Sequence, residues 1–158
     1  LLNVPPERGA ILVAASGRME ECQQWLAWSE TLLAAWPSDL PPLRVAFPTE
    51  AARSAAPAVA DILTHHLPLL ECLPAARLVL GAAGYNLSAE TRTLGIPALQ
   101  FPAKRLYDDQ YSRLTEEPFD PRVDLVIARI RGKMLHGPPR IPPYRNGAAA
   151  DGLIILDA

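Results

Sequence analysis

The chain has little of several features that would assign it to a class at once. Its 158 residues include only two cysteines, Cys22 and Cys72, which lie far apart and have no Cys or His neighbour at metal-ligand spacing. This arrangement favours two buried, reduced thiols over a disulfide, and with them a cytoplasmic location. No apolar run approaches the roughly 18 residues that a membrane-spanning helix needs. Residues 1–9 lack the basic and apolar regions of a signal peptide.

Charge of one sign is scarce as well, because the net charge is −2. A chain so close to neutral gives no electrostatic reason to expect nucleic acid or an anionic membrane surface as a partner. The dinucleotide-binding signature GxGxxG does not occur. The phosphate-binding loop GxxxxGK[ST] does not occur either, which disfavours kinase or NTPase chemistry. The paired histidines His65 and His66 do not predict a metal site. They are either a general base or, in the simpler interpretation, residues at a helix end.

What the chain does have is an alternation of apolar and amphipathic segments. Residues 10–15 (AILVAA) form a continuous apolar run, as in a central parallel strand. Further strands are predicted at residues 43–47, 78–81 and 98–101, and an edge strand or a turn at 67–73. Helices are predicted at residues 19–36, 51–65, 86–94, 108–115, 121–135 and 146–156. This order predicts one Rossmann-like α/β domain over residues 1–158, with a parallel sheet covered by helices on both faces.

The stretch 81–110 contains most of the residues suited to binding a ligand. Here a strand runs into a glycine-rich corner and directly into a helix, an arrangement that aims backbone N–H groups at an anion. Gly84 would let a diphosphate approach the backbone. The amides expected to point at it are those of Asn86, Leu87 and Ser88. The alternative is an ordinary strand-to-helix turn in which Asn86 is the N-cap.

Polar side chains follow that corner at positions suited to a ribose and a sugar. Glu90 lies one helical turn after Asn86, and its carboxylate could accept two hydrogen bonds from a ribose diol. Its simpler interpretation is a solvated helix residue. Asp109 and Gln110 offer acceptors and donors for adjacent sugar hydroxyls, although an aspartate here is equally an N-cap. Arg105 would neutralise phosphate or be a plain loop charge.

A second anion corner is predicted, on a weaker signal, at Ser16 and Gly17, where the first strand ends. Ligands of parallel sheets bind beyond the carboxyl ends of the strands. We therefore expect this corner and the one at Gly84 to emerge at the same edge of the sheet. Neither Ser16 nor Ser88 has the GxSxG context of a catalytic nucleophile.

Taken in order, these residues resemble the signature of the C-terminal, donor-binding domain of the GT-B glycosyltransferases, in the MurG-type and UDP-glycosyltransferase branches. The matching positions are Gly84-Tyr85-Asn86-Leu87-Ser88-Ala89-Glu90, Gly95-Ile96-Pro97, Pro102 and Asp109-Gln110. The match is close over residues 81–110 and loose over the flanking strands and helices. One departure is Ala82, at a position where the family often has a phosphate-contacting histidine.

The resemblance implies a role for each matching residue. Gly84, Asn86 and the following amides would hold the diphosphate of a nucleotide sugar, with a UDP-sugar as the favoured donor. Glu90 would bind the ribose, Asp109-Gln110 the transferred sugar, and the base would lie near residues 67–77. No metal or other cofactor is implied, because the helix N-terminus stabilises the departing nucleotide diphosphate.

The resemblance also implies a missing partner, since the family's acceptor-binding half and usual catalytic base belong to a separate N-terminal domain. We expect that domain to be absent from residues 1–158. The chain would then be the donor-binding domain of a hexosyltransferase, with unassigned catalytic residues and with any peripheral membrane association made through the missing domain. The alternative is a non-catalytic nucleotide-sugar binding or scaffold module that works with a partner subunit. An epimerase of the same fold is disfavoured, because no paired acidic residues with a histidine lie near Glu90.

Overall fold

A parallel β-sheet forms the centre of the structure, a computed structural model that describes residues 9–15, 17, 19–47, 59, 61–64, 69–102, 107–114 and 120–136. The strands are β1 (Ala10–Ala14), β2 (Leu43–Ala46), β3 (Leu63–Thr64), β4 (Ala76–Ala82) and β5 (Ala98–Phe101). All neighbouring strands are parallel. The helices are α1 (Met19–Ala34), α3 (Tyr85–Leu94) and α4 (Val123–His136), with 3-10 turns η2 (Leu69–Glu71), η3 (Leu73–Ala75) and η4 (Tyr111–Arg113).

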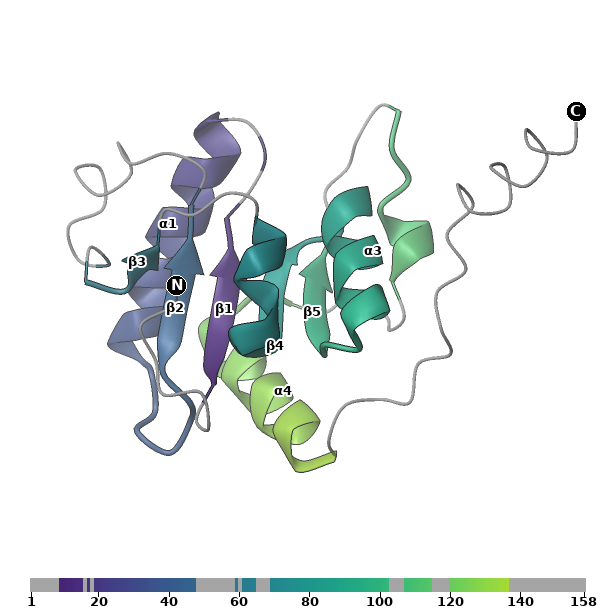
Figure 1. Ribbon diagram of the computed structural model, residues 1–158. Helices are drawn as coiled ribbons and strands as arrows, with labels where there is room; N and C mark the ends of the chain where they lie inside the picture. Colours follow the sequence, from purple (N-terminus) through teal and green to yellow (C-terminus); the bar gives the residue numbers. More distant parts are fainter. Residues whose placement is uncertain are drawn as a thin grey trace, which may run out of the picture.

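Helices cover both faces of this sheet because successive side chains of β1 point to opposite sides. Ile11 and Val13 pack in one apolar cluster with residues of α1 and α4. Ala10, Leu12 and Ala14 pack in a second cluster with Leu73 of η3 and Leu87 of α3. Figure 1 shows α3 on one side of the sheet and α1 and α4 on the other. The predicted Rossmann-like α/β fold is therefore confirmed.

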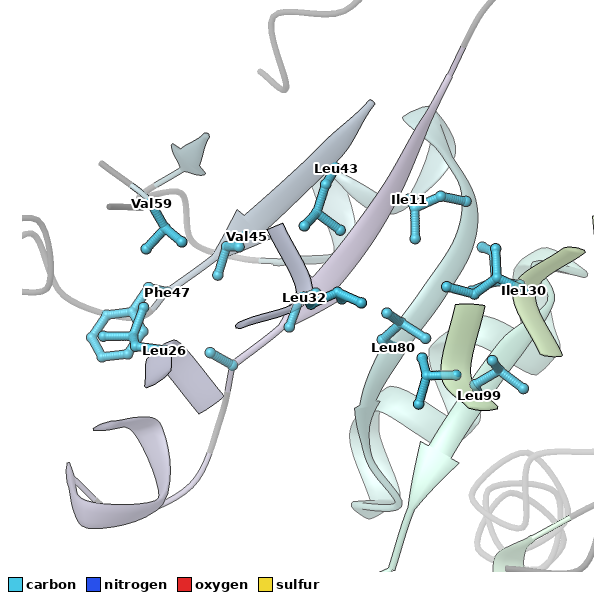
Figure 2. Packing of buried hydrophobic residues seen from close by; sticks show 14 of the residues in the cluster. Ile11, Leu26, Leu32, Leu43, Val45, Phe47, Val59, Leu80, Leu99 and Ile130 are labelled. Atoms are coloured by element: carbon cyan, nitrogen blue, oxygen red, sulfur yellow. The ribbon is translucent and has the colours of Figure 1, made fainter. Parts of the chain in front are cut away.

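The larger cluster lies between the sheet and the pair α1 and α4. Leu32 of α1 and Ile130 of α4 are fully buried and face strand residues such as Ile11, Leu80 and Leu99 (Figure 2). All of these side chains are aliphatic. The strands appear in the sequence as continuous apolar runs because helices bury both faces of the sheet.

The strand order β3-β2-β1-β4-β5 gives the sheet a switch point. The chain moves outward from β1 through β2 to β3, and then returns to the other side of β1 for β4 and β5. Between β1 and β4 the direction of progress reverses. In open parallel sheets, the crevice at the carboxyl ends of two such strands is where ligands bind.

Most predicted elements are confirmed within two residues, but two segments differ. The helix predicted at residues 51–65 is wrong at its end, because Leu63–Thr64 is strand β3, paired with Val45 and Ala46 of β2. This pairing depends on a contact that the local pattern could not indicate. For residues 67–73, predicted as an edge strand or a turn, the turn is confirmed over the described residues, which form η2 and η3. The helix predicted at 146–156 lies outside the described residues.

The second difference is in the helix predicted at residues 108–115, of which the described part contains only η4. The Asp109 carboxylate accepts a hydrogen bond from the Ser112 amide at 3.3 Å, and the Ser112 hydroxyl donates to the Asp109 carbonyl at 2.9 Å. Such local side-chain bonds offer the backbone an alternative to helical pairing. Asp109 therefore stabilises a turn instead of starting a helix.

Both cysteines are buried and unbridged, as predicted. Burial raises the pKa of the Cys22 and Cys72 thiols, which keeps them protonated and unreactive at neutral pH. Among the helices that the structure describes, none combines the length and the apolar character needed to cross a membrane.

The end of α3 supplies a first testable prediction. Gly95 ends the helix with a φ of 66°, and its amide donates to the Arg92 carbonyl at 3.1 Å. We expect Gly95→Ala to lower the free energy of unfolding by about 1 kcal/mol, because an alanine is strained in this left-handed conformation. Gly132→Ala is the matched control, since a Cβ at either glycine would meet nothing within 4 Å. Because Gly132 lies inside α4, Gly132→Ala should raise the free energy of unfolding by about 0.5–1 kcal/mol. Chemical denaturation measures both changes, and two changes of the same sign would contradict the prediction.

Candidate functional site

The corner between β4 and α3 is open and slightly different from the one expected. The helix begins at Tyr85, with Gly84 as its N-cap. The Ser88 amide donates to the Gly84 carbonyl at 3.0 Å. The predicted use of the Ser88 amide for an anion is therefore wrong, and so is Asn86 as the N-cap, because Asn86 lies inside the first turn. The amides of Asn86 and Leu87 have no acceptor within the helix, which leaves the helix end positive.

The backbone at position 84 does not require a glycine. Its φ of −69° and ψ of 155° are open to any residue. A Cβ added there would meet no atom of the residues that the structure describes within 4 Å. Asn86, beside it, is exposed. The space above this corner is therefore accessible to a ligand from solvent.

Two of the predicted site residues turn their side chains inward. Leu87 packs in the smaller apolar cluster, directly over the bare backbone of Gly81. Ser88 is only 3% exposed, and its hydroxyl accepts a hydrogen bond from Gln100 Nε2 of β5 at 2.9 Å. Both side chains thus hold α3 against the sheet. Gln100 was not predicted, because a lone glutamine at a strand end carries no recognisable signal.

Glu90 is a half-buried carboxylate on α3. Burial raises the pKa of its side chain. Within the part of the chain that the structure describes, no hydrogen bond or ion pair to this carboxylate is found. A partly desolvated acceptor without a cation is the kind of group that ligand hydroxyls can satisfy.

Asp109 and Gln110 do not face the same space. Asp109 is exposed and accepts the Ser112 amide, whereas Gln110 is 4% exposed. Gln110 Nε2 donates to Asp108 Oδ2 at 3.1 Å. The predicted pair of adjacent sugar contacts is therefore not presented as one surface.

Arg113 is the cation that sequence reasoning missed at this corner. Its Nη1 donates to the Ala83 carbonyl at 3.3 Å, next to Gly84. It forms an ion pair with Asp108 and lies 5.8 Å from the centre of the Tyr85 ring. The predicted cation, Arg105, lies outside the described residues. Arg113 reaches the corner only because η4 folds back towards the end of β4.

The two predicted corners do emerge at the same edge of the sheet. Ala14 of β1 pairs with Gly81 of β4, and Gly17 and Gly84 follow these partners at equal spacing. Gly17 has a φ of 111°, and a Cβ there would lie 2.1 Å from Glu21 Oε2. A carboxylate at the start of α1 repels phosphate, so this corner is unsuited to an anion. Ser16 lies outside the described residues.

The base position that the resemblance implies is contradicted for residues 69–77. Residues 69–75 lead into β4 and residues 76 and 77 begin it, whereas Gly84 follows its end. A strand of this length separates the two edges by roughly 20 Å. Residues 65–68, which include both paired histidines, lie outside the described part of the chain.

No cluster of three or more His, Cys, Asp or Glu that could hold a metal occurs among the described residues. The fold and the site together define a Rossmann-like α/β domain with an open strand-to-helix corner at its switch point. In sequence comparisons the chain matches no family model, and no curated protein matches it.

Proposed function

We propose that this chain binds a nucleotide-diphosphate sugar, a UDP-sugar first of all, at the corner between β4 and α3, as the donor-binding domain of a GT-B type glycosyltransferase. The observation that supports this most is Gly84. The backbone angles there are ordinary, and no described residue lies within 4 Å of an added Cβ, so the described part of the fold does not require glycine. A diphosphate that must approach the backbone closely does require it.

The other contacts follow from the geometry around Gly84. The amides of Asn86 and Leu87 and the positive end of α3 would hold the diphosphate. Glu90, which is half-buried on the same helix, would accept hydrogen bonds from the ribose hydroxyls. The same helix end would stabilise the charge that develops on the departing diphosphate, without a metal. Transfer with inversion would also need an acceptor-binding domain or subunit that supplies the general base.

A non-catalytic nucleotide-sugar binding module is the second candidate. It is favoured by the arrangement of Asp109 and Gln110, of which one is exposed in a turn and the other buried. A protein that holds the nucleotide without engaging the sugar would bind UDP and UDP-glucose equally. A donor domain should bind UDP-glucose more tightly than UDP at matched conditions.

The experiment that tests the site is calorimetric titration of the chain with UDP, GDP, dTDP and ADP, repeated on Gly84→Ser. We expect UDP to bind, and the serine, which would stand in the diphosphate's space, to weaken it about tenfold or more, the equivalent of about 1.4 kcal/mol. Serine is a better N-cap than glycine by a few tenths of a kcal/mol, so stability should be equal or higher.

The control is Gly132→Ala, which also fills open space but lies on α4. It should leave UDP affinity unchanged. If the unsubstituted chain binds none of the four nucleotides, the proposed function is wrong. If Gly84→Ser binds UDP as tightly as the unsubstituted chain, the diphosphate does not occupy this corner.

A further inference from the structure

The segment 107–114 is attached to the β4–α3 corner through the side chains of two arginines. Arg113 of this segment donates from Nη1 to the Ala83 carbonyl at 3.3 Å. In the opposite direction, Arg92 of α3 donates from Nη2 to the Arg113 carbonyl. The segment pairs with no strand, and η4 is the one regular element in it. These two cross-links, together with the burial of Gln110, hold the segment in position.

Asp108 extends the link to Gln110, a buried residue that follows the exposed Asp109 in the chain. One carboxylate oxygen pairs with Arg113, and the other accepts the Gln110 side-chain amide at 3.1 Å. Gln110 is thus connected through Asp108 and Arg113 to the Ala83 carbonyl at the end of β4. The Tyr85 ring, 5.8 Å from the guanidinium carbon, limits the movement of Arg113 on a further side.

We infer that Arg113 is a positioning residue that holds the segment 107–114, and with it the exposed Asp109, at a set distance from the diphosphate corner, and so determines how the sugar is recognised. The functional half of this inference rests on the proposed function. A direct phosphate contact is disfavoured, because the charge of Arg113 is already matched by Asp108. The planar guanidinium donates in fixed directions to several partners at once, which a lysine ammonium cannot reproduce.

Hydrogen exchange measured by mass spectrometry tests the positioning without any ligand. In both Arg113→Gln and Arg113→Lys, peptides covering residues 107–114 should exchange about tenfold faster, while peptides of β1 and β4 stay within about twofold. Arg122→Gln is the control, because Arg122 also makes a local pair with an aspartate, Asp120, at 2.9 Å. It should change neither set. Unchanged exchange of 107–114 in Arg113→Gln, or full rescue by lysine, would overturn the inference.

Titration with UDP and UDP-glucose tests the consequence for recognition. Arg113→Gln should reduce the preference for UDP-glucose over UDP about tenfold, with UDP affinity changed less than about threefold. An equal loss of affinity for both ligands would show a direct diphosphate contact and overturn the positioning role. If the unsubstituted chain binds neither ligand, the proposed function fails, and hydrogen exchange alone then decides whether Arg113 holds the segment.

Discussion

Glu90→Gln is expected to weaken the binding of UDP and of UDP-glucose by about 30- to 100-fold. Hydrogen bonds to a charged group contribute about 1.5–3 kcal/mol each, and an amide in place of the carboxylate removes the charge from the ribose contacts. Calorimetric titration measures the effect directly. The substitution keeps the size and shape of the side chain, so a loss of binding would report the charge and the acceptor rather than a gap in α3.

The same substitution should not destabilise the domain. Burial raises the pKa of Glu90, which means that its ionised form is less favourable in the folded chain than in the unfolded chain. The stability linked to this group is therefore fully present below its unfolded pKa and is lost as the pH rises through its folded pKa. At neutral pH Glu90→Gln removes that unfavourable ionisation, so denaturation should show equal or higher stability.

Binding should depend on pH in the opposite direction. The ribose contact needs the carboxylate, so affinity for UDP-glucose should fall as the pH drops through the raised pKa of Glu90. The diester phosphates of UDP-glucose take up no proton in this range. A step in affinity as the pH changes would therefore come from the protein. Glu90→Gln should remove the step, and Glu30→Gln, on α1 across the sheet, should keep it. A step that persists in Glu90→Gln would assign it to another group.

Gly81→Val is expected to lower the free energy of unfolding by about 2–3 kcal/mol through overpacking. A Cβ on Gly81 would lie 2.5 Å from Leu87 Cδ2 and 3.3 Å from the Ala14 carbonyl. Leu87 can rotate away to some extent, but the carbonyl belongs to the neighbouring strand β1 and cannot. The larger valine would therefore push α3 off β4, although valine itself favours strands.

Chemical denaturation followed by tryptophan fluorescence gives the measurement. Gly81→Ala should be intermediate, because it adds one of the three carbons. Gly84→Ala is the matched control at the end of the same segment, where a Cβ meets nothing, and it should cost less than about 1 kcal/mol as a weakened N-cap. Equal effects at Gly81 and Gly84 would contradict the close packing of α3 on β4.

The sequence by itself determined the elements whose signals are local. The apolar run at residues 10–15 contains strand β1, which is buried on both faces. The segment 98–101 is strand β5, in which Leu99 is buried and the other residues are half-buried. The strand, glycine corner and helix around Gly84 were predicted because they are contiguous in the chain. Gly17 and Gly84 lie at equal spacing after two paired residues, one in β1 and one in β4. Their emergence at the same edge followed from the parallel topology of the sheet.

Tertiary structure alone decided the features that depend on residues distant in sequence. Leu63–Thr64 is a strand only because β2 lies beside it. Arg113 reaches the Ala83 carbonyl across 30 positions, and Ser88 of α3 is hydrogen-bonded to Gln100 of β5. Local periodicity and propensity act over one or two turns of chain, whereas these contacts form only after the sheet has brought separate segments together. The glycine corner was therefore visible in the sequence, and the arginines that hold a segment against it were not.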